Sequence, residues 1–304
     1  MKTASFSTIG ALAAAPFLAA APSYADDGPI SAEFSAGVEY DDHLSVSEID
    51  RTSNDEDFAA ILDAGIGLEH ETNGGTAFSA GYDFFQSVHF DRSDFDIRSH
   101  RGSVGLAQDF GEFDLGVDYN YVYSTLDDVG FLTYQLLSPY VASSLTKQLY
   151  VRAAYSYADK DFKSRPTRDA TVNAGGADVF FFLNGTTTYL LFGYKFEHED
   201  AVGPEFDFDA HNLKARLTQK FPFNGRKGAL KIGWRYENRD YDSITPSIGA
   251  VRDDERNRFQ AEIELPLSDH VYAQAEYEYS DFDSNLPAVN YTQNLISARL
   301  GVKY

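Results

Sequence analysis

The sequence predicts an all-β fold, a transmembrane antiparallel β-barrel of about fourteen strands. Three observations support it. Apolar and polar residues alternate along most of the chain, which is typical of strands with one oily and one wet face. The runs exceed the roughly five to six residues of a soluble strand and match the length needed to cross a bilayer at a tilt. Finally, the chain has 24 Phe and 20 Tyr but one Trp, and barrels place aromatic girdles at membrane interfaces.

The first 25 residues have the pattern of a secretory signal peptide. Lys2 supplies the positive charge, residues 9–21 form an apolar run, and residues 23–25 form a small-x-small cleavage site. The run is too short to span a membrane as a helix. We therefore divide the chain into a signal peptide, residues 1–25, and a barrel, residues 26–304. The chain has no cysteine, which excludes disulfides, thiolate metal sites and a lipidated N-terminal Cys.

Alternation defines each strand in turn. In residues 32–40, Phe34 and Val38 alternate with Glu33 and Glu39, and the later runs follow the same rule. The run at 170–184 is the least regular, because three consecutive phenylalanines leave its register open. The predicted strands are 32–40, 57–70, 76–90, 101–110, 112–125, 131–145, 147–160, 170–184, 186–199, 208–221, 227–241, 256–267, 270–282 and 290–304. An even number of strands places both termini in the periplasm.

Short and long connections alternate along the chain, as in bacterial barrels with short periplasmic turns and long outer loops. The short ones are predicted at 71–75, 111, 146, 184–185, 222–226 and 268–269. The long ones are predicted at 41–56, 90–99, 126–130, 160–169, 200–207, 242–255 and 283–289. We expect 41–56 and 242–255, the longest, to face the cell exterior and to be cut by protease on intact cells.

The last strand ends the chain on an aromatic residue. Its apolar face consists of Ile296, Ala298, Leu300, Val302 and Tyr304. A terminal strand exposes an unpaired edge unless it closes the sheet. This pattern resembles the closing strand of bacterial outer-membrane barrels, in which that strand is also the signal read by the barrel assembly machinery.

The polar faces of the strands predict the lining of the lumen. The predicted basic lining residues are Lys214, Arg216, Lys220, Lys231, Arg235, Arg239 and Arg258. The predicted acidic lining residues are Asp57, Asp63, Glu69, Asp83, Asp109, Asp114 and Asp118. The two sets are far apart in sequence and should face each other, which would create a transverse field that tunes ion selectivity. The alternative is local neutralisation, because Glu237, Glu262, Glu264, Glu276 and Glu278 lie near the basic set.

Other classes of function find little support. A net charge of −22 argues against nucleic-acid binding. The acidic loops match no spaced calcium-binding loop, and we predict no metal site and no cofactor. The chain contains no G-x-S-x-G or H-E-x-x-H sequence, and we predict no catalytic residues and no enzymatic activity. We interpret the acidic loops as solvated surfaces. The expected partners of the barrel are outer-membrane lipid and lipopolysaccharide.

Short Asp- and Tyr-rich segments at the strand ends carry a family resemblance. They are G-V-E-Y-D-D at 37–42, G-Y-D-F-F-Q-S-V-H at 81–89, Y-A-D-K-D-F at 157–162, R-D-Y-D at 239–242 and Y-S-D-F-D-S-N at 279–285. With the fourteen strands, they resemble the C-terminal barrel domain of surface lipoprotein assembly modifiers and related porin-like barrels. In that family a tetratricopeptide domain precedes the barrel. Here the first predicted strand follows the signal peptide after about half a dozen residues.

We expect from all this a channel for small solutes in the outer membrane of a Gram-negative bacterium. The resemblance implies an alternative, the export or surface display of a lipoprotein or polysaccharide with a periplasmic partner protein. A plugged barrel with a structural role is the third interpretation.

Overall fold

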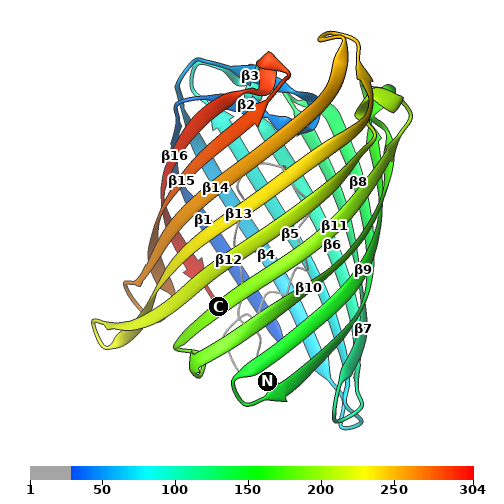
Figure 1. The fold of residues 1–304 in the computed structure, drawn as a ribbon. Coiled ribbons are helices and arrows are strands. Elements are labelled where there is room, and N and C mark those ends of the chain that lie inside the picture. Colours follow the sequence, from blue (N-terminus) through cyan, green and yellow to red (C-terminus); the bar gives the residue numbers. More distant parts are fainter. Residues whose placement is uncertain (1–28) are drawn as a thin grey trace.

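Fourteen antiparallel strands form a closed barrel in a computed structural model that describes residues 29–304 (Figure 1). The predicted fold class and strand number are confirmed. The predicted signal peptide, residues 1–25, lies outside the described residues. The barrel strands are β1 (Ile30–Asp41), β4 (Asp57–Glu71), β5 (Thr76–His89), β6 (Ile97–Asp109), β7 (Asp114–Leu126), β8 (Val129–Thr146), β9 (Leu149–Phe162), β10 (Ala170–Asn184), β11 (Thr188–Ala201), β12 (Phe208–Phe223), β13 (Arg226–Thr245), β14 (Ala250–Pro266), β15 (Val271–Ser284) and β16 (Tyr291–Lys303).

Each barrel strand pairs with its neighbour in sequence, and β1 pairs with β16 to close the sheet. The closing register runs from Glu33 opposite Lys303 to Asp41 opposite Leu295. Short connections gather at one end of the barrel, the turn end, where β1 begins and β16 finishes. Longer connections gather at the other, the loop end (Figure 1). Closure leaves no barrel strand with an unpaired edge, which satisfies the backbone of a membrane-spanning sheet.

Two connections differ from those predicted. Residues 126–130 were expected as a long loop, but β7 and β8 join through a two-residue turn at Asp127 and Asp128. Both have positive φ, 53° and 58°, which is the backbone of a tight hairpin turn and is tolerated by Asp. The prediction of a long loop at 242–255 was also wrong. β13 continues to Thr245 and β14 begins at Ala250, so only four residues connect them.

The first loop differs as well. It contains two short strands, β2 (Leu44–Val46) and β3 (Arg51–Ser53), which form a small hairpin separate from the barrel sheet. The 3-10 turn η1 (Ser47–Ile49) and Asp50 connect them. Its apolar residues Leu44, Val46 and Ile49 are buried, which the sequence did not predict.

Alternation places apolar side chains on the outer surface of the barrel and polar ones inside. In β10, the register that the sequence left open is now defined: Phe181 is exposed outside, while Phe180 and Phe182 stack on each other with ring centroids 6.4 Å apart. Large hydrophobic side chains, including Phe34, Ile66 and Phe192, are exposed around the outer surface. Such a surface suits lipid rather than water. In residues 29–304, no helix is long and apolar enough to cross a membrane.

Candidate functional site

The interior of the barrel carries charges on most strands, and the predicted basic residues lie on β12, β13 and β14. Four of them are in ion pairs with neighbouring carboxylates. Lys214 contacts Asp178 at 3.0 Å, Lys231 contacts Glu262 at 2.7 Å, Arg239 contacts Glu237 at 2.7 Å and Arg258 contacts Glu278 at 3.0 Å. The local pairing that the sequence left as an alternative is therefore present for Lys231, Arg239 and Arg258, whereas Lys214 pairs with Asp178, which the sequence analysis did not name.

Arg235 differs from its neighbours. It lies directly opposite Lys214 on β12 and Arg258 on β14, so three cationic side chains share one row across adjacent strands. Within residues 29–304, Arg235 has no ion pair at 4.0 Å or less. Arg216 follows Lys214 on the same face of β12, toward the turn end. Lys220 lies on that face as well, after Thr218. Because Lys214 and Arg258 are paired with carboxylates, Arg235 is the residue of the row whose charge no ion pair among residues 29–304 neutralises.

The predicted acidic residues lie on β4 to β7, across the barrel from this row, because seven strands separate the centres of the two groups around the ring. Three of these carboxylates bind arginines that the sequence analysis did not assign to the lumen. Asp63 contacts Arg299 at 2.9 Å, Asp83 contacts Arg101 at 2.8 Å and Asp118 contacts Arg152 at 2.6 Å. The alternation on β6, β9 and β16 identifies these arginines as inward-facing, and only the strand pairing shows which carboxylate each one meets.

The other predicted acidic residues lie at the two ends of the barrel. Asp57 is buried at the loop end and accepts hydrogen bonds from the backbone N–H groups of Phe58, Asp91 and Arg92, so it orders the next loop. Asp109 and Asp114 are paired in register at the turn end, and Glu69 lies near that end of β4. Asp57 thus has a structural role outside the proposed acidic wall.

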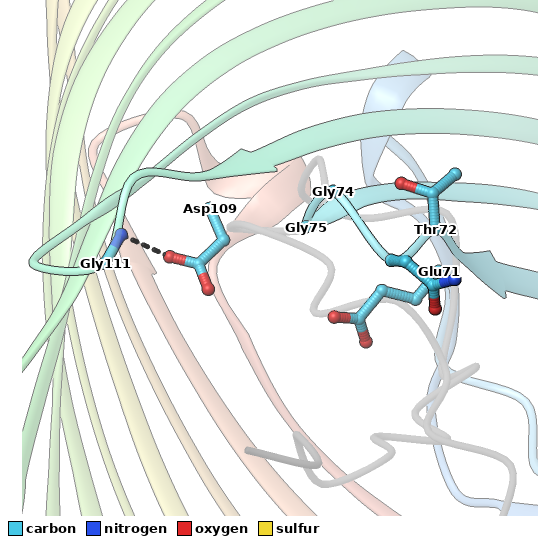
Figure 2. A pocket seen from close by; sticks show the side chains of 7 residues that line it. Glu71, Thr72, Gly74, Gly75, Asp109 and Gly111 are labelled. Carbon is cyan, nitrogen blue, oxygen red and sulfur yellow. Dashed lines mark hydrogen bonds between the residues drawn. The ribbon is translucent and has the colours of Figure 1, made fainter.

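A shallow hollow of about 560 Å³ lies among the turns of the turn end (Figure 2). Glu71 and Asp109 are its carboxylates, and Asp109 accepts a hydrogen bond from the backbone N–H of Gly111. Gly75 and Gly111 have positive φ of 76° and 88°, a conformation that suits glycine. The lining consists of tight turns, which indicates a rim of the barrel rather than a binding site for a specific ligand.

The first loop, residues 42–56, folds into the mouth of the barrel at the loop end. Its side chains Leu44, Val46 and Ile49 are buried in one apolar cluster with residues from the far wall. The barrel residues of this cluster are Leu126, Phe131, Leu132, Tyr134, Leu136, Ala158, Phe162 and Val172, together with Phe95. We call residues 42–56 the plug loop, because it reaches from β1 across the mouth to β7 through β10.

Polar contacts attach the plug loop to the rest of the rim. His43 stacks on Tyr291 of β16 with ring centroids 4.2 Å apart. The hydroxyl of Thr52 donates to the carbonyl of Ala288 at 2.7 Å. Arg51 forms an ion pair with Asp94 and lies over the ring of Phe95. The loop is thus fixed on several sides of the mouth.

The strongest attachment is at Asp50, at the tip of the plug loop. Arg252 of β14 donates from Nη1 and Nη2 to the two carboxylate oxygens, both at 3.0 Å, and Arg168 contacts the same carboxylate. Burial alone would raise the pKa of Asp50, but the two arginines outweigh it and lower this pKa to about 2. Asp50 therefore stays ionised at any ordinary pH. We call Asp50, Arg168 and Arg252 the latch.

Glu48 lies two residues before Asp50, and its pKa is raised whereas that of Asp50 is lowered. Its Oε1 atom is buried without a hydrogen-bond partner among the described residues. Burial raises the pKa of Glu48 to about 7, although a hydrogen bond to its own backbone and the charges of Lys160, Arg239 and Arg256 act to lower it. These three cations already contact Glu199 or Glu237, which limits what they offer to Glu48. The plug loop therefore contains a carboxyl group that titrates near neutral pH.

The closing strand ends at the turn end. The backbones of Ala32 and Tyr304 exchange hydrogen bonds of 2.9 and 3.0 Å, and the Tyr304 ring stacks on His270 with centroids 4.6 Å apart. Ile296 and Leu300 are exposed on the outer surface. The apolar face of the strand is thus oriented as the alternation indicated, whereas its role as an assembly signal stays a prediction.

Several solved outer-membrane barrels share this architecture over nearly their whole length. An anion-selective porin from Comamonas acidovorans aligns with a TM-score of 0.53 at 11% identity and covers 90% of this chain and 98% of its own. OmpT, an outer membrane protein of Vibrio cholerae, aligns in its trimer form with a TM-score of 0.54 at 10% identity, over 90% of this chain and 99% of its own. A loop L8 deletion mutant of OmpT gives a TM-score of 0.55 at 12% identity, over 92% and 100%.

These identities establish the fold alone, which is that of porin-like outer-membrane barrels. No protein-family profile matches the chain, and no curated protein matches it.

Proposed function

We propose that this protein is an outer-membrane channel for small solutes, without enzymatic activity, and that it prefers anions. The observation that carries the proposal is the row of Lys214, Arg235 and Arg258, in which Arg235 has no carboxylate partner among residues 29–304. An unneutralised guanidinium on the wall of a water-filled barrel raises the local concentration of anions. The anion-selective porin among the structural neighbours is consistent with this preference.

Ion selectivity in planar bilayers tests the proposal. Arg235→Gln should shift the reversal potential toward cations in a salt gradient, because it removes the unpaired charge. Arg98→Gln is the matched control, because Arg98 pairs with Asp128 at the exposed loop end and the substitution removes the same charge outside the row. A reversal potential that does not move in Arg235→Gln would show that neighbouring carboxylates already neutralise the row.

We propose further that the loop end faces the cell exterior and the turn end the periplasm, as short periplasmic turns require. Extracellular protease should then cut intact cells at 202–207 or 246–249, which connect strands at the loop end. It should spare 72–75 and 224–225 at the turn end. Cleavage confined to the turn end would reverse the orientation.

Two other functions follow from particular features. Export of a lipoprotein or polysaccharide with a periplasmic partner rests on the resemblance to surface lipoprotein assembly modifiers. A closed structural barrel is favoured by the plug loop, which fills part of the mouth. Wild-type protein that gives no conductance steps, while a variant with a released plug loop conducts, would favour the structural role. Absence of conductance from both would favour export.

A further inference from the structure

The latch has the construction of a binding site for a carboxylate. Arg252 offers two parallel N–H donors to the Asp50 carboxylate at 3.0 Å each, the bidentate arrangement by which arginine recognises planar oxyanions. Arg168 adds a second guanidinium to the same group and also donates to the carbonyl of Glu48 at 2.9 Å. One carboxylate therefore receives donors from two arginines on opposite elements.

Each arginine has a partner outside the plug loop, Arg252 on the barrel and Arg168 in a neighbouring loop. Arg252 lies over the Tyr241 ring with its Cζ 4.7 Å from the centroid, and its Nε and Nη2 also contact Asp254 at 2.8 and 2.7 Å. Arg168 lies over the Phe206 ring at 4.1 Å. These contacts do not involve the plug loop, so they hold both guanidinium groups when Asp50 leaves, whereas the bond from Arg168 to the Glu48 carbonyl goes with the tip.

The charge around the latch favours an anion in the place of Asp50. A connected network contains four guanidinium groups and three carboxylates, those of Arg168, Arg239, Arg252, Arg256, Asp50, Asp254 and Glu237. Asp254 is buried and stays with Arg252, and Glu237 stays between Arg239 and Arg256. Departure of Asp50 leaves an excess of two positive charges in this network, on side chains that are mostly buried, which attracts a replacement anion.

We propose that Arg168 and Arg252 form a carboxylate-binding site at the loop end, that Asp50 is its internal ligand, and that a small solute carboxylate competes with Asp50. Its binding releases the tip of the plug loop, residues 47–50. The release part of this proposal rests on the channel function, because an open tip matters only where solutes pass. The binding part does not.

Calorimetric binding of succinate to the folded, detergent-solubilised barrel tests the binding part. Asp50→Asn should bind succinate at least tenfold more tightly than the wild type, because the internal competitor has lost its charge. Asparagine is a suitable substitute since Asp50 has a φ of 51°, a conformation that Asn also adopts. Asp128→Asn is the control: it removes one charge at an exposed loop-end position with a φ of 58°, and its affinity should equal that of the wild type.

Arg168→Gln gives a second test that does not depend on Asp50→Asn folding. It removes one of the two guanidinium groups, and Asp50 keeps Arg252. Succinate affinity should fall at least tenfold relative to the wild type. Equal affinity of wild type, Asp50→Asn and Arg168→Gln would overturn the proposal, and so would equal tightening in Asp50→Asn and Asp128→Asn, which would indicate general electrostatics.

The chemical class of the ligand is tested with inorganic phosphate. If Asp50→Asn binds phosphate as tightly as succinate, the assignment to carboxylates is wrong. In bilayers, succinate at constant ionic strength should raise the open probability of the wild type and leave Asp50→Asn unchanged. Tight succinate binding by Asp50→Asn in a protein that gives no conductance would refute the channel function but not the binding site.

Discussion

Glu48→Gln should make the plug loop insensitive to pH. In the closed loop the pKa of Glu48 is about 7, against 4.5 for the ordinary group, because burial disfavours the charged carboxylate. Lys160, Arg239 and Arg256 face Glu48 from β9, β13 and β14 and oppose this shift without cancelling it. Protonated Glu48 therefore fits the closed loop, and ionised Glu48 does not.

The sign follows from linkage. A carboxyl group with a raised pKa in the closed state stabilises that state below pH 4.5, and this stabilisation is lost as the pH rises toward 7. From pH 5 to pH 8, the change amounts to about 2.5 kcal/mol, or about 70-fold in the ratio of open to closed loop. Water in the lumen screens part of this, so we expect at least tenfold. Asp50, with a pKa of about 2, does not titrate in this window.

Single-channel recordings at pH 5 and pH 8 measure the effect as open probability. The wild type should open more at pH 8, and Glu48→Gln, which mimics the protonated side chain, should stay mostly closed at both values. Glu56→Gln is the control within the same loop, since Glu56 is exposed and bonds to the Tyr40 hydroxyl; it should keep the wild-type profile. A wild-type open probability that does not change with pH, or a pH response that persists in Glu48→Gln, would refute the reasoning.

Three further predictions concern assembly, packing and the plug loop. Tyr304→Asp should reduce the heat-modifiable folded barrel, since a charge on the outer surface is destabilising to a degree that depends on depth, and for Asp less than the roughly 2–4 kcal/mol of Arg or Lys at the midplane; normal yield would exclude an assembly role. Gly301→Val should lower stability by about 1–3 kcal/mol, because the Tyr272 ring would meet its Cβ at 2.2 Å, whereas Gly102→Val, with open space around it, should fold normally in the same gel assay. Leu44→Asp should give a larger conductance than Asp50→Asn, because a charge in the apolar cluster expels the whole loop; equal conductance would show that the latch alone closes the mouth.

Alternation was sufficient to predict the barrel because every strand in a one-layer sheet faces the same two environments. An apolar residue such as Phe34 therefore indicates the outer surface, and a charged neighbour such as Glu33 indicates the lumen. Strand ends were less predictable. The polar residues of 250–255 suit either a loop or a strand that extends beyond the membrane, and only their pairing with β13 identifies them as strand.

The charged interior was predictable by residue but not by partner. Alternation places Asp118 and Arg152 on inward faces, yet their contact at 2.6 Å reaches across β8, where the Tyr140 ring lies under the Arg152 guanidinium. The plug loop was missed for a related reason. Asp50 and Arg252 are 202 residues apart, and no local pattern reports a contact across the mouth. The apolar Leu44, Val46 and Ile49 in an otherwise acidic loop were the available signal.

The two kinds of attachment in the plug loop act on different parts of it. Leu44 and Val46 in β2 are buried at the base of the small hairpin, and each contributes about 1.5–3 kcal/mol by burial. Asp50 and Ile49 are at the tip. A carboxylate that replaces Asp50 at the latch leaves the base contacts intact, so the tip has to remove only one apolar side chain, Ile49, from the cluster. Once another carboxylate occupies the latch, the tip therefore costs less to displace than the base of the small hairpin, so binding there can move the tip without unfolding the loop.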